Sequence, residues 1–268
     1  MSPEENCGRA DRAQLGASAS AGRVTSPAAG SRGEVRPFPT DPGVMARIFR
    51  MRREHVREVA GLHAAAMGNS LWAQLGRGFL ETLYEGLLKS PRFIAFVYVE
   101  EGSTRGFIAG SSDSGRMFRD VLGQCWLSLG ICAVRGVLRR PRLLISLLAT
   151  PLYWRRSTVD ADTAQITAES LFCSFRSDLR GTRVSGHINK VLFDELAWRG
   201  HARVKITTEV DNAGAVRQLT AWGFEDRGEF GFYGKRMRTY VLDLLGSPRV
   251  HPAEFDEERA GRSHPRHE

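Results

Sequence analysis

Cysteine is scarce in this chain, and so are long stretches without charge. The four cysteines among 268 residues are too few for a disulfide-held scaffold. They form neither a Cys-x-x-Cys pair nor a cluster with histidine, so we expect no metal site. No stretch holds the ~18–20 uncharged apolar residues that span a bilayer, and the first twenty residues lack the apolar run of a signal peptide. Together these absences favour a reduced, cytoplasmic setting.

Acidic residues are outnumbered, because 30 Asp and Glu face 38 Lys and Arg and leave a formal net charge of +8. A basic balance favours anionic partners, namely nucleic acid, a membrane surface, or a phosphorylated cofactor or substrate. The chain has no nucleic-acid recognition motif and no ladder of basic and aromatic residues, so we expect no nucleic-acid partner. With 42% apolar and 25% charged residues, most of the chain can bury a core.

Both ends of the chain lack apolar periodicity. Residues 1–43 are rich in Gly, Ala, Ser, Pro and Arg, and they predict a disordered arm. Residues 247–268 predict a disordered tail for the same reason. The folded domain is therefore expected over residues 44–246.

Within this domain, alternating and helical patterns follow one another. The expected order is β-α-α-β-β, an insertion, and then β-α-β-α-β-β. A β-α-β crossover near the middle implies parallel neighbours, so the fold class is α/β or α+β. Strands are expected at 44–51, 93–99, 107–111, 165–175 and 203–210, with a closing hairpin after residue 224, and helices at 54–67, 71–90, 180–200 and 211–222.

The insertion covers residues 116–156. Two apolar runs, 126–134 and 143–154, are interleaved with eight arginines and a single acid, Asp120. We expect helix with breaks at Gly136 and Pro141. Three interpretations stay open. The first is a helical lid over the substrate that also packs on the core, with Trp126, Tyr153 or Trp154 lining it. The second is an oligomer contact such as a homodimer, and the third is an interfacial helix on anionic lipid.

The segment 165–200 predicts a strand, a glycine-containing basic turn and a helix. Unpaired N–H groups at a helix start attract anions, and the helix dipole adds to this attraction. Arg180 and Arg183 add positive charge, so the turn is a candidate phosphate site; the alternative is an ordinary solvated turn. His187 follows the turn, where we expect it on the surface.

Two stretches carry a family resemblance. AESLFCSFRSDLRGTRVS (168–185) resembles, without a gap, the first motif of the GNAT (Gcn5-related N-acetyltransferase) superfamily, and DNAGAVRQLTAWGF (211–224) resembles its second motif. The resemblance implies a mixed, mostly antiparallel sheet with a central splayed parallel strand pair, flanked by helices. It also implies acetyl-CoA as co-substrate and transfer of its acetyl group to an amine.

The resemblance also implies which residues hold acetyl-CoA. Backbone groups of the first splayed strand would bind the pantetheine arm, and Asn212 would contact the pantetheine or cap its own helix. The sequence departs from the family pattern in two places. Arg183 and Ser185 stand where the family has glycine, and Leu219 stands where the family often has a tyrosine that acts as the general acid. The implied cofactor-binding residues are Cys173, Ser174 and Phe175 on the strand, and Arg180, Gly181, Thr182, Arg183, Val184, Ser185 and Gly186 in the turn.

A carboxylate is expected to accept the proton of the amine. Glu169 on the first splayed strand is favoured over Glu209 at the end of the second, and the alternative for either is a solvated carboxylate or an ion pair with arginine. In place of the tyrosine acid that the family often has, we expect water, Tyr233 or no residue at all to protonate the leaving thiolate. The predicted activity is acetylation of a small-molecule amine; the alternatives are a protein or peptide N-acetyltransferase, and a module that binds CoA or a partner without catalysis.

Overall fold

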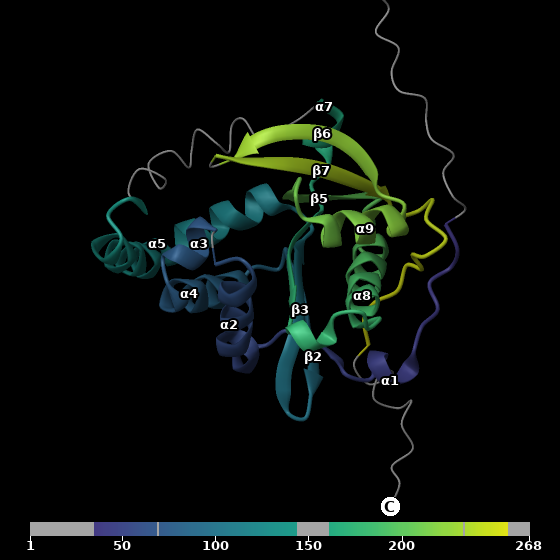
Figure 1. Ribbon diagram of the computed structural model, residues 1–268, viewed down its shortest axis with the longest axis horizontal. Helices are drawn as coiled ribbons and strands as arrows, with labels where there is room; N and C mark the ends of the chain where they lie inside the picture. The colour runs from purple at the N-terminus through teal and green to yellow at the C-terminus, as the bar shows by residue number, and fades with distance from the viewer. Residues whose placement is uncertain (1–34, 69, 144–160, 233, 257–268) are drawn as a thin grey trace, which may run out of the picture. The chain divides into compact units, whose positions relative to one another are not determined.

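The computed structural model describes residues 35–256 apart from 69, 144–160 and 233. In these residues a seven-stranded sheet has the order β1-β2-β3-β4-β5-β7-β6 (Figure 1). Neighbouring strands are antiparallel except β4 and β5, which are parallel. The predicted sheet with one central parallel pair is therefore confirmed. The strands are β1 Ile48–Arg50, β2 Phe93–Glu100, β3 Ser103–Ser111, β4 Glu169–Phe175, β5 Arg203–Glu209, β6 Glu225–Phe232 and β7 Lys235–Asp243.

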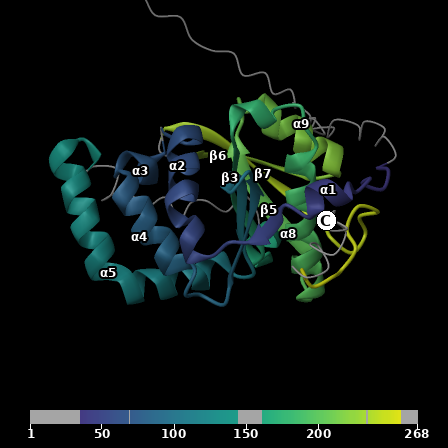
Figure 2. The ribbon, with the colours of Figure 1, turned by 90° about the horizontal axis from the view of Figure 1, so that it is seen from below.

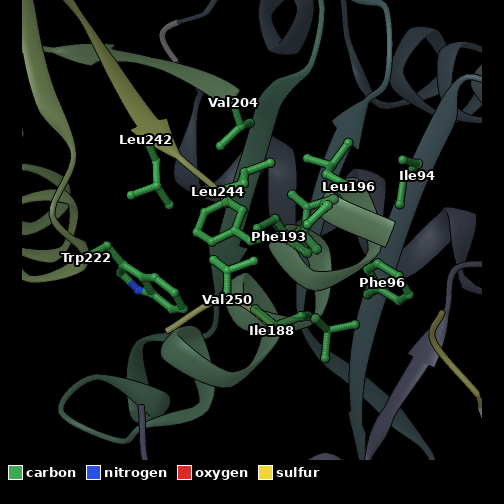
Figure 3. Close-up of a cluster of buried hydrophobic side chains, with 14 of the residues drawn as sticks. Ile94, Phe96, Ile188, Phe193, Leu196, Val204, Trp222, Leu242, Leu244 and Val250 are labelled. Atoms are coloured by element: carbon green, nitrogen blue, oxygen red, sulfur yellow. The ribbon is translucent and has the colours of Figure 1, made fainter. Parts of the chain in front are cut away.

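Helices cover both faces of the sheet (Figure 1, Figure 2). α8 and α9 bury one apolar cluster that includes Phe193 and Trp222 (Figure 3). α2, α4 and α5 bury a second cluster around Tyr84 and Phe107. The helices are α1 Pro42–Met45, α2 Val56–Ala66, α3 Leu71–Gln74, α4 Arg77–Leu87, α5 Ser114–Arg139, α7 Ala161–Gln165, α8 Val184–Trp198 and α9 Ala213–Trp222, with short 3-10 helices at Arg53–His55 and Ser177–Leu179.

α8 follows from its apolar spacing. Val184, Ile188, Leu192 and Leu196 recur every four residues, and all four are buried in the first cluster. Gly200 lies just beyond the helix with φ +86°, the left-handed conformation that a glycine adopts when it ends a helix. The helix is thereby fixed against the sheet, and its N-terminus lies directly after the turn that follows β4.

Several predicted elements differ from the structure, and β3 and β4 begin at Ser103 and Glu169 where residues 107 and 165 were expected. The first strand is shorter, because Pro42 starts the short helix α1 and β1 covers only Ile48–Arg50. The second predicted helix is divided into α3 and α4 at Gly76, whose φ of +103° is incompatible with helix. α5 runs unbroken through Gly136, where a Cβ would lie 2.7 Å from the Leu75 carbonyl oxygen, so this glycine permits close packing and does not end the helix. The second apolar run of the insertion lies outside the described residues from residue 144 onward.

The ends of the domain extend beyond the predicted boundaries. Phe38, in the arm predicted to be disordered, stacks on Trp222 with ring centroids 5.6 Å apart. Val250 and Phe255, in the predicted tail, pack on the first cluster, and Phe255 meets the Phe96 ring at 4.9 Å. Residues 35–43 and 247–256 are therefore part of the packed domain, because single apolar side chains anchor segments of otherwise polar composition.

A buried carboxylate holds the C-terminal segment on α8. Glu195 is fully buried and accepts hydrogen bonds from the Arg50 guanidinium at 3.0 Å, from the Arg199 guanidinium at 2.8 and 3.0 Å, and from the Phe255 backbone N–H at 2.9 Å. Both carboxylate oxygens are satisfied, which compensates for the desolvation of a buried charge.

Candidate functional site

The parallel strands β4 and β5 part after a very short contact. Their register contains two pairs, Glu169 with Lys205 and Ser170 with Ile206. Beyond Ser170, β4 stays paired with β3 as far as Phe175, while β5 stays paired with β7 as far as its own end. The edge of β4 that faces β5 is therefore open over the rest of the strand.

An irregularity in β4 lies at the point where the strands part. Ala109 of β3 faces Phe172, whereas the next residue, Gly110, faces Ser170, so Leu171 is an extra residue on β4. A β-bulge of this kind bends its strand and increases the local twist. Because the bulge follows Ser170 directly, it explains how β4 keeps β3 as a neighbour while it turns away from β5.

The three residues predicted to hold the pantetheine arm lie on this open part of β4. Cys173 has exposed surface, but the protein around its thiol raises the pKa of that thiol to about 12, so it is packed more closely than a fully solvated side chain. Ser174 is buried and its hydroxyl donates to the Leu62 carbonyl oxygen of α2 at 3.2 Å. Phe175 packs against the first core cluster. The neighbouring side chains thus fix the strand, and the exposed Cys173 leaves the middle of the open part accessible.

The turn after β4 leads into the N-terminus of α8. Gly181 adopts φ +81°, with nothing within 4 Å of the position that a Cβ would occupy. The Thr182 hydroxyl donates to the Leu179 carbonyl oxygen at 2.7 Å and fixes the turn. Arg183 is the N-cap residue and supplies no side-chain cap, so the first N–H groups of α8 lack a side-chain acceptor.

Positive charge is exposed around this helix start. Arg180 and Arg183 are both exposed, and neither forms an ion pair with any residue that the structure describes. Free N–H groups, the helix dipole and two unpaired guanidinium groups all favour an anion. These features would suit an anion at the end of the open strand.

Residues of the N-terminal segment, Phe38 and Asp41, pack against the start of α8. A Cβ at Gly186 would lie 2.6 Å from the Phe38 ring, so the small size of Gly186 accommodates Phe38. His187 is fully buried, which corrects the expected surface position. Its Nδ1 donates to the Arg183 carbonyl oxygen at 2.7 Å and its Nε2 accepts from the Asp41 N–H at 2.8 Å. Sequence reasoning missed this support because the arm was expected to be disordered.

The two candidate bases differ in their surroundings. Glu169 is half-buried at the start of β4, and its Oε2 accepts a 2.6 Å hydrogen bond from the hydroxyl of Ser114, the first residue of α5. Glu209 is 49% exposed and forms an ion pair with Lys235 on β7, which is one of the alternatives that the sequence left open, with lysine in place of arginine. Lys205 is the residue of β5 that pairs with Glu169. Glu209 lies four residues beyond Lys205, a distance of roughly 13 Å along β5. The structure therefore does not bring the two carboxylates together.

The remaining predicted residues have simpler positions. Asn212 caps α9, because its Oδ1 accepts from the Ala215 N–H at 3.1 Å, and its Nδ2 donates to the Thr208 hydroxyl at 3.4 Å. Leu219 is buried in the first core cluster. Tyr233 lies outside the described residues. The cap was one of the two roles expected of Asn212, and a contact with pantetheine stays a prediction.

A buried histidine lies behind β4 on the α2 side. His63 is 1% exposed, its Nδ1 lies 2.8 Å from the Tyr84 hydroxyl, and its ring centroid lies 4.9 Å from that of Phe172. Burial lowers the pKa of His63 to about 4 and raises the pKa of Tyr84. Within the described part of the chain no three His, Cys, Asp or Glu residues are grouped to hold a metal ion.

Comparisons with known proteins find similarity among solved structures only. No protein-family model and no curated protein matches the chain. Among solved structures, SsHAT is 16% identical, with a TM-score of 0.50 over 74% of this chain and 97% of SsHAT. An N-acetyltransferase from Staphylococcus aureus Mu50 is 14% identical, with a TM-score of 0.47 over 74% of this chain and 97% of that one. A ribosomal-protein-alanine N-acetyltransferase from Brucella melitensis is also 14% identical, with a TM-score of 0.47 over 73% and 98% of the two chains.

Identities this low show the fold alone. The SsHAT comparison covers nearly all of that protein, and the parted strands β4 and β5 lie where the two sequence motifs predict them. The chain therefore has the mixed α/β fold of the GNAT N-acetyltransferases.

Proposed function

We propose that the chain is an acetyl-CoA-dependent N-acetyltransferase that acetylates a primary amine of a small molecule. The observation that carries the proposal is the open edge of β4, which ends in the uncapped, basic start of α8. A strand edge offers backbone groups to the amides of a pantetheine arm. The N–H groups of α8, with Arg180 and Arg183, suit a pyrophosphate at the end of that arm.

The proposed chemistry is direct transfer from the thioester. The amine nitrogen forms a bond to the acetyl carbonyl carbon, the carbon–sulfur bond breaks, and the CoA thiolate leaves and takes a proton from water. Glu169 accepts the proton that the amine loses, directly or through a water molecule. A backbone N–H on the open edge of β4 stabilises the negative charge that develops on the carbonyl oxygen.

Aromatic side chains in the layer of helices that contains Ser114 would suit a small acceptor. The Trp72 ring of α3 lies 5.5 Å from Phe118 of α5 and 6.5 Å from Phe172 of β4, measured between centroids. The three rings are half-buried and belong to the same layer as Ser114, the partner of Glu169. They offer an apolar wall for an enclosed substrate. Trp126 does not belong to this wall, because its side chain is 64% exposed. It also lies twelve residues beyond Ser114, which is about 18 Å along α5.

A second candidate is a module that binds CoA without catalysis. The buried Leu219 favours it, because this position contributes to the core and provides no acid. The two functions separate in an assay of thiol release from acetyl-CoA with a panel of amino sugars, polyamines, amino acids and peptides. We expect turnover with at least one small amine. Saturable acetyl-CoA binding with no release above the hydrolysis rate would favour the module, and turnover with peptides alone would favour a protein or peptide N-acetyltransferase.

A further inference from the structure

The outward face of α5 is apolar, and no residue in the described part of the chain covers it. Residues 121–134 contain no charged side chain. Of the nine large apolar side chains that are exposed in the described residues, six lie on this one helix, and they are between 46% and 78% exposed. The six are Leu122, Trp126, Leu127, Ile131, Val134 and Leu138.

The opposite face of α5 packs on the domain over its whole length. Met117, Val121 and Leu129 are buried in the second core cluster. Further along, a Cβ at Gly136 would touch the backbone of Leu75, so the end of the helix also lies tightly against its neighbours. The first residue of α5, Ser114, contacts β4 through Glu169, whereas the far part of the helix is outermost in this layer, with α3 and α4 between it and the sheet (Figure 2). Its apolar stripe therefore faces away from the domain.

α5 also has the length and composition of a membrane-crossing helix. Its most apolar 18-residue window has a mean hydropathy of 1.6, and 17% of that window is buried. The longest uncharged run in this helix, residues 121–134, is still shorter than the ~18–20 residues of the sequence criterion. Because the inner face packs on α3 and α4, α5 would lie along a bilayer surface and would not cross it.

The charges at the two ends of the stripe indicate what covers it. Asp120 is paired with Arg92, and Asp113 caps the helix and pairs with Arg116, so no acid next to the stripe is left without a basic partner. A second copy of the helix, in either direction, would bring arginines close to arginines. An anionic surface complements them. The exposed arginines are Arg116 and Arg119 at one end, and Arg135, Arg139, Arg140 and Arg142 at the other.

From this combination we infer that α5 docks the protein on the surface of an anionic lipid bilayer. The apolar stripe enters the boundary between headgroups and acyl chains, and the arginines contact the phosphates of the headgroups. The helix axis lies in the plane of the surface, with α3 and α4 behind it.

Vesicle sedimentation tests the inference with the full chain. We expect the protein to sediment with vesicles that contain phosphatidylglycerol and to stay in solution with pure phosphatidylcholine. The combined substitutions Leu127→Ser, Ile131→Ser and Leu138→Ser should lower the affinity for anionic vesicles by about tenfold or more, since each removes an exposed aliphatic side chain that the bilayer would bury. The control Leu245→Ser removes a similarly exposed leucine, 65% exposed, outside α5 and should leave binding unchanged.

Charge is tested separately. Replacing Arg135 and Arg139 by Gln should weaken binding by about fivefold for each arginine at low salt. Circular dichroism and thermal unfolding verify that each variant is folded. Equal binding to both kinds of vesicle, or unchanged binding of the triple variant, overturns the inference. Sedimentation velocity that shows a dimer lost in the triple variant, without vesicle binding, would instead assign the stripe to a second copy of the chain.

Discussion

Replacing Glu169 by Gln is the most direct test of the proposed base. The amide keeps the shape of the side chain and can still accept the hydrogen bond from Ser114, so the local structure should persist. What is lost is basicity. A general base contributes about 10²–10⁴-fold to the rate, which corresponds to about 3–5 kcal/mol in the activation free energy.

The loss should fall on kcat, measured as thiol release from acetyl-CoA with the best amine of the panel. The KM for acetyl-CoA should change little, because the turn and α8 form a separate contact. The deficit should shrink as the pH rises, since more of the amine is then already deprotonated and needs no base.

Glu209→Gln is the matched control. Glu209 is half-exposed, pairs with Lys235 on the surface and lies roughly 13 Å along β5 from the level of Glu169. An exposed pair contributes about 1 kcal/mol or less, so this variant should keep most of the activity. If the Glu209 variant is the impaired one, the two roles are exchanged. If both variants turn over like the wild type, neither carboxylate acts as the base and the reasoning is wrong.

Three further predictions concern stability and binding. Burial holds the pKa of His63 at about 4, against 6.5 in the unfolded chain. The free energy of unfolding should therefore fall by up to about 3 kcal/mol as the pH is lowered from 6.5 to 4, and urea unfolding at both pH values should show a smaller fall for His63→Gln. Glu195→Gln should cost about 3–5 kcal/mol by the same method, whereas the surface variant Glu81→Gln should cost about 0.5 kcal/mol or less. Gly181→Ala and Gly200→Ala should each cost about 1–2 kcal/mol, because both backbones are left-handed, but calorimetry should show weaker acetyl-CoA binding for Gly181→Ala alone.

Much of the fold is predictable because its signals are local. The four-residue spacing from Val184 to Leu196 is enough to orient α8, and the strand, turn and helix motif places the basic turn before it. The order of strands and helices follows from the same local patterns. The parallel pair then follows from the crossover rule, since a helix joins two strands of one sheet.

The parts that were missed depend on contacts between residues far apart in the chain. The bulge at Leu171 is defined only by its pairing with β3, and the bond from Ser114 to Glu169 joins residues 55 positions apart. Gly136 was expected to end a helix, but its role is set by the backbone of Leu75. Phe38 anchors a segment whose composition indicates disorder, because one aromatic ring on Trp222 outweighs many polar neighbours.

Calorimetric titration of the wild-type chain with acetyl-CoA tests the central claim most directly. The open edge of β4 and the basic start of α8 predict saturable binding of one acetyl-CoA per chain. The affinity should fall as salt is raised, since arginines and helix N–H groups hold the phosphates. No heat, together with no rise in the unfolding temperature at millimolar acetyl-CoA, would contradict the assignment of this site and with it the proposed function.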